Sequence, residues 1–298
     1  MLTNQMLDHL KQQLGSGEIE NIRSVHQTIA HVSYRFKANG SFFLLKIAEP
    51  LFSKTVTSEY VGLKFLRDSK CVRTPEIFDF YAGDIEIPTY LLVEWIERGS
   101  STSAGQKILG EQLAALHDAS SEIFKISQFG FEENNYIGNN PQYNTWHPDW
   151  PAFFVQQRLK PQIQIGLQKG FIDNQFHNQL NRLCEKIPKL LGEQHFVPCL
   201  LHGDLWGGNV LFDSENRPVL IDPAVYFGVP EAELAFTEMF GGFTRDFYKA
   251  YDSVLPIPHG YKERKKLYNL YHVLNHLNLF GQMYMHEAKA ICSTYVGR

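Results

Sequence analysis

Hydrophobic and polar positions follow two different patterns along this chain of 298 residues. In the first third, short apolar runs separated by turn residues predict β-strands. These runs are Ser24–Ala30, Ser33–Lys37, Phe42–Ile47, Ile77–Tyr81 and Thr89–Ile96. Two stretches with helical spacing accompany them, Met1–Leu14 and Thr55–Ser69. The pattern predicts a small lobe built on an antiparallel sheet.

Beyond a polar stretch at Arg98–Gly105, helical spacing dominates. The predicted helices are Leu109–Ala119, Trp150–Gly170, Asp173–Leu191, Glu231–Phe240 and Arg264–Ala290. We therefore expect an α+β protein with two lobes, residues 1–96 and residues 97–298, of which the second is larger and mainly helical. A cleft between two such lobes is a common place for an active site.

The charge and cysteine content exclude several classes of function. The net charge is −4 and the chain has no run of basic residues, so neither nucleic acid nor an anionic membrane is an expected partner. The four cysteines are far apart, which argues against a zinc site or a disulfide framework and fits a reducing compartment. No apolar run has the length of a membrane span. We expect a cytoplasmic enzyme, and the oligomeric state stays open.

The most informative motif is His-Gly-Asp-Leu-Trp-Gly-Gly-Asn at residues 202–209. Asp204 and Asn209 have the spacing of the catalytic loop of kinases. Two apolar runs around a turn, Val210–Phe212 and Val219–Ile221, predict a hairpin that returns Asp222 beside Asn209. Asp204 is then the candidate catalytic carboxylate, and Asn209 and Asp222 are candidate Mg²⁺ ligands. The alternative is a polar loop whose side chains only cap local turns.

The predicted small lobe offers partners for a nucleotide. Lys46 lies in an apolar strand, and Glu59 lies on the apolar face of the following helix, so we expect them to pair near the phosphates. The alternative is an edge lysine and a solvent-facing glutamate. Backbone groups near Glu94 and Ile96, just before the lobe junction, could bind adenine, although an ordinary core strand fits this segment equally well.

Several long segments resemble the fructosamine kinase (ketosamine-3-kinase) family, within the aminoglycoside phosphotransferase-like kinases. They are residues 135–138 (NYIG), 141–146 (PQYNTW), 222–226 (DPAVY), 240–243 (FGGF) and 268–279 (YNLYHVLNHLNL). The resemblance implies a bilobal fold like that of protein kinases, with ATP and Mg²⁺ as cofactors. It also implies phosphorylation of a sugar hydroxyl on ketoamine (fructosamine or ribulosamine) adducts, a deglycation activity. The acceptor would be a small ketoamine or a glycated protein side chain.

The resemblance assigns the roles given above to Asp204, Asn209, Asp222, Lys46 and Glu59. Two departures from the family pattern stand out. The loop at residues 29–34 contains no glycine, so that it offers only its amides and the Ser33 hydroxyl to a phosphate. Residues 229–230 are Val-Pro where family members carry His-Arg.

Candidate acceptor-binding residues are Trp206 and Trp146, which could stack on the sugar, and Asp149, which could meet an ammonium group. Asp149 could equally be the cap of the helix that begins at Trp150. His202 is expected to scaffold the catalytic loop. His272 and His276 lie one helical turn apart, and we expect them in the core rather than in a metal site.

Three further readings of the catalytic motif stay open. The chain could be a kinase for another amine-bearing acceptor, such as an aminoglycoside or a choline-like amino alcohol. It could be a nucleotide-binding protein with weak turnover, which the glycine-free loop favours. It could also be a metal-dependent hydrolase that uses His202, Asp204 and Asp222.

Overall fold

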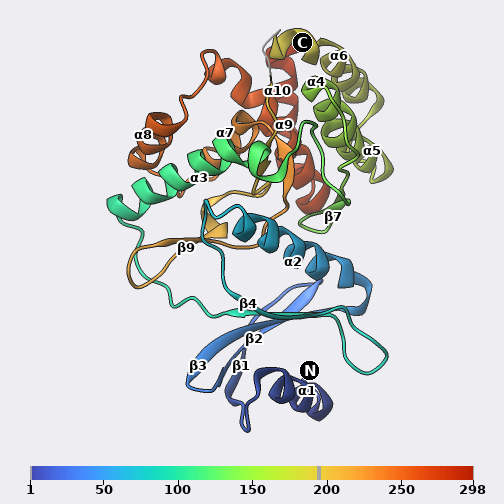
Figure 1. The fold of residues 1–298 in the computed structure, drawn as a ribbon. Helices are drawn as coiled ribbons and strands as arrows, with labels where there is room; N and C mark the ends of the chain where they lie inside the picture. The colour runs from blue at the N-terminus through green and yellow to red at the C-terminus, as the bar shows by residue number, and fades with distance from the viewer. Residues whose placement is uncertain (1, 193–195, 298) are drawn as a thin grey trace.

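The computed structural model describes residues 2–192 and 196–297. Two lobes are stacked on each other, with the N-terminus in the sheet-containing lobe and the C-terminus at the far end of the helical lobe (Figure 1). This is the α+β, two-lobed architecture that the sequence predicts. The boundary between residues 96 and 97 stays a prediction.

The N-terminal lobe is one antiparallel sheet of five strands with the order β1-β2-β3-β5-β4. The strands are β1 (Glu20–Gln27), β2 (His31–Ala38), β3 (Ser41–Ala48), β4 (Ile77–Tyr81) and β5 (Tyr90–Glu94). Helix α1 (Asn4–Leu14) packs on one face and α2 (Ser53–Asp68), which follows the short 3₁₀ helix η1 (Pro50–Phe52), packs on the other. In Figure 1, α2 lies between the sheet and the helical lobe. The central strand is β3. Because α2 lies between the sheet and the helical lobe, the β3 side chains on the face that α2 covers point toward the lobe interface.

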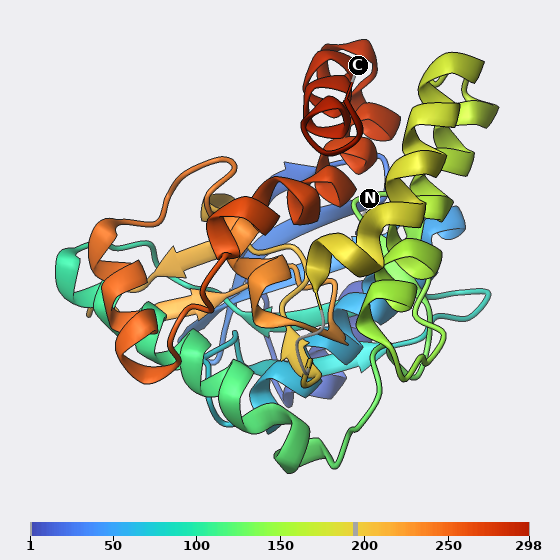
Figure 2. The same cartoon turned by 90° about the horizontal axis from the view of Figure 1, so that it is seen from above.

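The C-terminal lobe is a helical bundle with short strands beside the lobe interface. Its helices are α3 (Ser103–Phe124), α4 (Trp150–Phe153), α5 (Lys160–Gln168), α6 (Asn174–Leu191), α7 (Pro230–Thr237), α8 (Arg245–Val254), α9 (Tyr261–Phe280) and α10 (Met285–Val296), with 3₁₀ helices η3 (Gly207–Asn209) and η4 (Gln282–Tyr284). Its strands are β6 (Asn135–Ile137), β7 (Asn140–Gln142), β8 (Cys199–Leu201), β9 (Val210–Phe212), β10 (Pro218–Leu220) and β11 (Tyr226–Gly228). Seen from above, α9 and α10 lie beside α5 and α6 (Figure 2).

Most predicted elements are present, but three helices differ. The single helix predicted at Arg264–Ala290 is wrong, because Gly281 has φ 87° and ends α9 before α10 begins. The predicted helix at Trp150–Gly170 contains a π-helical turn, η2 (Phe154–Leu159), just before Pro161, which has no N–H to continue the α-helical ladder. Helix α8 was not predicted; it packs against α3 through the buried Phe247 and Tyr251.

Ion pairs and backbone bonds connect the β9–β10 hairpin to the N-terminal lobe. Arg73 binds Glu94 at the end of β5 and also Asp213 in the hairpin turn. The Gly99 amide donates to the Phe212 carbonyl at 2.7 Å. These contacts fix the hairpin that carries the predicted metal ligands against the lobe junction. Within the described ranges, no helix is long and apolar enough to cross a membrane.

Candidate active site

The loop at residues 202–209 is held in place by buried hydrogen bonds. It follows β8, which pairs with β11. The buried His202 accepts a hydrogen bond at Nδ1 from the Asp204 amide (3.3 Å), and its Nε2 donates to the Ile221 carbonyl (2.9 Å). Gly203 has φ 83°, and a Cβ there would lie 2.0 Å from the Ala224 carbonyl oxygen, so only glycine fits. The expected scaffolding role of His202 is confirmed.

A buried carboxylate beneath the loop was missed in the sequence. Glu233 on α7 accepts hydrogen bonds from the amides of His202 (3.0 Å) and Gly203 (2.7 Å) and from Nε2 of His117 (3.1 Å). Burial alone would raise the pKa of Glu233, but the hydrogen bonds from His117 and Gly203 outweigh it and lower this pKa. A glutamate in the apolar helix sequence PEAELAFT is the signal that could have revealed it.

Asp204 and Asn209 are in direct contact. The Asn209 side-chain amide donates to the Asp204 carbonyl oxygen at 2.8 Å and to Asp204 Oδ2 at 3.0 Å. Burial raises the pKa of Asp204 to about 7, with Asp222 and Glu233 adding to the rise and the Asn209 hydrogen bond opposing it. A carboxylate with its pKa near neutrality is suited to accept a proton from a hydroxyl.

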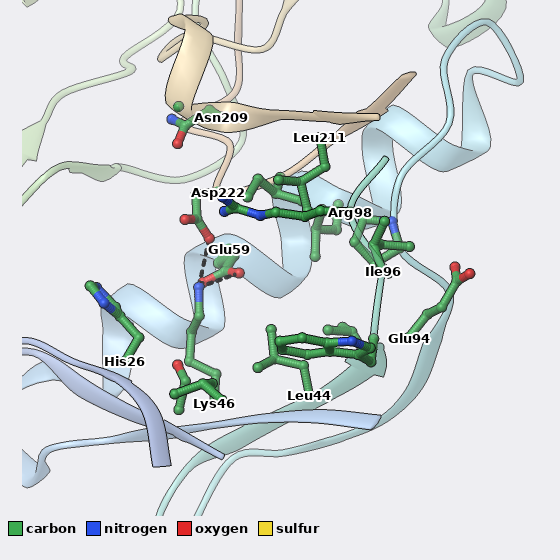
Figure 3. Close-up of a pocket in the computed structure, with 18 of the residues that line it drawn as sticks. His26, Leu44, Lys46, Glu59, Glu94, Ile96, Arg98, Asn209, Leu211 and Asp222 are labelled. Atoms are coloured by element: carbon green, nitrogen blue, oxygen red, sulfur yellow. Dashed lines mark hydrogen bonds and ion pairs between the residues drawn. The ribbon is translucent and has the colours of Figure 1, made fainter. Parts of the chain in front are cut away.

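Lys46 binds one carboxylate of its own lobe, Glu59, and one of the other lobe, Asp222. Its ammonium lies 2.7 Å from both oxygens of Glu59 and 2.6 Å from Asp222 Oδ1, as the dashed lines in Figure 3 mark. Lys46 is buried in the central strand, so the alternative of an edge lysine is wrong. The predicted contact between Lys46 and Glu59 is confirmed.

Burial and neighbouring charges shift the pKa values of Lys46, Glu59 and Asp222 in different ways. Burial would lower the pKa of Lys46, but Asp222 and Glu59 raise it, so the ammonium stays charged. Burial raises the pKa of Glu59 to about 7 against the effect of Lys46. Burial would also raise the pKa of Asp222, yet Lys46 lowers it to about 2. Asp222, half-exposed toward the cleft, is therefore the group that carries negative charge into it.

A cavity of about 620 Å³ lies between the lobes, and Lys46, Glu59 and Asp222 line it (Figure 3). Its apolar wall is formed by residues from both lobes, among them Leu44, Leu63, Val93, Ile96, Leu211 and Ile221. An apolar slot next to a cluster of charged groups matches the two halves of a nucleotide.

The segment at Glu94 and Ile96 borders this cavity. The Glu94 amide donates to the Glu76 carbonyl at 2.8 Å, and the Glu94 carboxylate binds Arg73. Among the described residues, none accepts a hydrogen bond from the Ile96 amide. Of the two positions, only Ile96 therefore keeps a backbone donor for adenine, whereas the Glu94 amide is occupied.

Asn209 and Asp222 both line the cavity, and their oxygens suit Mg²⁺. The nitrogen of the Asn209 side chain is engaged with Asp204, which leaves its oxygen for a cation. Asp222 has φ 53°, a left-handed conformation that aspartate tolerates better than most residues. In the described part of the chain, no group of three or more His, Cys, Asp or Glu residues could hold a metal.

The structure separates the three acceptor candidates. Trp206 lines the cavity and is 41% exposed, with its indole lying over Gly208, where a Cβ would be 2.2 Å from the ring. Trp146 instead packs against Phe227, and Asp149 caps α4 by accepting from the Ala152 amide at 2.8 Å. Neither of these two lines the cavity.

Other predicted polar residues have clear positions. Ser33 is buried, lines the cavity and pairs with Lys46 across the sheet. His272 stacks on Phe236 with ring centroids 3.6 Å apart, and His276 Nδ1 donates to the His272 carbonyl at 2.6 Å. The expectation of core packing is confirmed for His272, whereas His276 is only half-buried.

Three cavity residues were missed at the sequence level: His26, His31 and Arg98. They lie on the first two strands and on the segment after β5. Their signal in the sequence was weak, because single basic residues on strands and loops are mostly surface residues.

Comparison with known proteins gives consistent results along the whole chain. The profile of the fructosamine kinase family matches residues 2–297. A probable ketoamine kinase of Synechocystis is 35% identical over 273 residues, which cover 91% of this chain and 88% of the relative. The chloroplastic protein-ribulosamine 3-kinase of Arabidopsis thaliana is 35% identical over 283 residues, or 94% of this chain and 83% of the relative.

Solved structures show the same fold. A Thermobifida fusca protein assigned to the fructosamine-3-kinases superposes with a TM-score of 0.86 at 26% identity and covers 100% of both chains. An aminoglycoside phosphotransferase in a ternary complex with AMP-PNP and hygromycin B has a TM-score of 0.69 at 17% identity and covers 98% of this chain and 99% of its own. The latter supports the fold alone.

Proposed function

We propose that this chain, which belongs to the fructosamine kinase family, transfers the γ-phosphoryl group of ATP to a sugar hydroxyl of a ketoamine adduct. The observation that carries the proposal is that Lys46, Glu59, Asp222 and Asn209 line the interlobe cavity, with Asp204 in hydrogen-bond contact with Asn209. Phosphoryl transfer requires these parts: a cation for the phosphates, oxygen ligands for Mg²⁺ and a carboxylate for the attacking hydroxyl.

Each residue has one task in this proposal. Adenine occupies the apolar slot and accepts a hydrogen bond from the Ile96 amide. Lys46, held by Glu59, binds the α- and β-phosphates. Asp222 and Asn209 would hold Mg²⁺, which would supply neutralisation of charge on the phosphate oxygens.

Asp204 orients the acceptor hydroxyl and accepts its proton. The hydroxyl oxygen forms a bond to the γ-phosphorus as the bond to the bridging oxygen of ADP breaks. His202 accepts a hydrogen bond from the Asp204 amide, and Glu233 holds the two preceding backbone amides, so that little reorganisation is needed during the reaction. The products are ADP and a phosphorylated ketoamine.

The acceptor is a small ketoamine or a glycated protein side chain, the substrate class that the relatives' names describe. Trp206, which lines the cavity, stacks on the sugar or on the ammonium group of the adduct in this proposal. We include neither Trp146 nor Asp149 in the acceptor site. The four cysteines are free thiols, which agrees with a cytoplasmic location.

An ATP-consumption assay with and without fructosyl-lysine or ribulosyl-lysine tests the proposal. We expect ATP turnover that depends on the ketoamine and yields a phosphorylated adduct. ATP binding without turnover on any ketoamine, aminoglycoside or amino alcohol would instead indicate a nucleotide-binding protein. Turnover only with aminoglycosides or amino alcohols would keep the kinase chemistry and change the acceptor.

A further inference from the structure

The turn between β1 and β2 borders the cavity, and three of its backbone amides, those of Thr28, Ala30 and His31, are bonded within the turn. The Thr28 hydroxyl oxygen accepts hydrogen bonds from the amides of Ala30 and His31, both at 3.1 Å. The Thr28 amide donates to the His31 carbonyl at 2.9 Å, which closes the turn. A glycine-rich loop would direct such amides at a phosphate. Here the amides of Ala30 and His31 are engaged within the turn.

Two imidazoles from the same hairpin line the cavity instead. His26 on β1 and His31 on β2 have ring centroids 5.9 Å apart. Figure 3 shows the His26 ring at the same end of the cavity as the Lys46 ammonium and Asp222. Lys46 is the residue that the proposed function places on the phosphates, so both imidazoles lie at the phosphate end.

We propose that His26 and His31 bind the phosphates of the nucleotide through their ring N–H groups, in place of the loop amides that Thr28 occupies. The inference rests on the proposed function, because it presumes that a nucleotide fills this cavity. It assigns to two side chains the task that a glycine-rich loop performs with its backbone.

The hydrogen bonds at Thr28 fit the tautomer of His31 that carries its proton on Nε2. With two amides donating to the Thr28 oxygen, the hydroxyl proton is free to donate, and His31 Nδ1 lies 3.3 Å away, as does the His31 carbonyl. When Nδ1 accepts this proton, Nε2 carries the ring hydrogen and donates into the cavity.

This donor does not require a charged ring. Burial and the nearby Lys46 lower the pKa of His31 to about 4, against an opposing effect of Asp222, and His26 also lowers it. A neutral imidazole still has one N–H group, and a hydrogen bond to an anionic oxygen is stronger than one between neutral groups.

Calorimetric titration of the full chain with Mg-ATP and, separately, with adenosine tests the inference. The variants are His26→Ala, His31→Ala and the double variant, with His286→Ala, an exposed histidine on α10, as the matched control. We expect each single substitution to weaken ATP by roughly 10- to 100-fold, the effect of one hydrogen bond to a charged group, and to leave adenosine binding unchanged. The control should match the wild type for both ligands.

A further variant, His31→Gln, separates a lost donor from a disturbed turn, because glutamine keeps an N–H group. We expect it to bind ATP more tightly than His31→Ala. Wild-type ATP affinity in the double variant would overturn the inference and leave the proposed function intact. An equal loss for ATP and adenosine would also overturn it, since the turn would then only shape the pocket. A wild-type protein that binds no nucleotide would overturn the proposed function as well.

Discussion

Lys46 Nζ donates a hydrogen bond to Asp222 Oδ1 at 2.6 Å, and this contact joins the central strand of one lobe to the segment that follows the β9–β10 hairpin of the other. The Lys46 ammonium is therefore bound to Asp222, the same carboxylate that would bind Mg²⁺ in the proposed function. Lys46 thus compensates the charge of Asp222. Binding of Mg-ATP would exchange this partner for the metal and leave Lys46 with Glu59 and the phosphates.

Asp222→Ala should abolish Mg²⁺-dependent ATP binding, because it removes a carboxylate ligand of the metal. Calorimetric titration with Mg-ATP measures this directly. The same titration in EDTA serves as the control, and there the variant and the wild type should bind ATP about equally. If Asp222→Ala bound Mg-ATP like the wild type, the metal would have to be held by other residues.

Asp204→Asn should lower kcat by on the order of 10²-fold or more while ATP affinity changes little, because asparagine cannot accept the hydroxyl proton. Steady-state kinetics and nucleotide titration on one preparation give both values. Asp118→Asn, an exposed position on α3, is the matched control and should behave like the wild type. A kcat close to that of the wild type in Asp204→Asn would exclude this residue as the catalytic group.

Glu233→Gln should destabilise the protein by about 2–4 kcal/mol. Glutamine replaces one carboxylate oxygen with an NH₂ group, so that either the Gly203 amide or the pair formed by the His202 amide and His117 loses its buried acceptor. Urea denaturation measures the free energy of unfolding. The exposed Glu185→Gln on α6 should stay within about 0.5 kcal/mol of the wild type. Equal stability of both variants would mean that Glu233 does not support the loop.

The catalytic motif could be predicted because its parts are close in sequence. Asp204, Asn209 and Asp222 are separated only by a tight loop and a hairpin, and the alternation of apolar runs shows that hairpin directly. The pairing of Lys46 with Glu59 could also be predicted, because a strand is followed by one helix whose apolar face carries the carboxylate.

Other parts of the site depend on contacts between distant elements. Glu233 reaches the catalytic loop only because α7 packs beneath β8, and its burial is not visible in the local pattern. Asp149 could be taken for a substrate ligand or a cap, since both readings need only a carboxylate before an apolar helix. The break at Gly281 was missed because the apolar spacing continues on both sides of it.

At neutral pH, Asp213→Asn should lower the free energy of unfolding. In acid, the variant and the wild type should have nearly the same stability. Burial alone would raise the pKa of Asp213, but hydrogen bonds from Arg217 and Arg73 lower it well below its usual range. A lowered pKa in the folded state contributes stability that is complete above the unfolded pKa, near 4, and is lost as the pH falls below it.

We therefore expect a difference of about 1–2 kcal/mol between Asp213→Asn and the wild type above about pH 5, which narrows as the pH drops below about 4. Denaturant unfolding at a series of pH values measures this difference. Asp118→Asn is again the control, with no such pH dependence. A difference that stayed constant down to the acid transition would contradict the role assigned to the two arginines.

The proposed acceptor is a ketoamine, and Trp206 is the residue that should recognise it. The most direct test is kcat/KM for fructosyl-lysine, free fructose and kanamycin, measured with the wild type and with Trp206→Ala. We predict that fructosyl-lysine is the best of the three, and that Trp206→Ala weakens its binding by about 1–3 kcal/mol, the range for a lost aromatic contact and its buried area, while KM for ATP is unchanged. Equal kcat/KM for kanamycin and fructosyl-lysine in the wild type would contradict the ketoamine assignment.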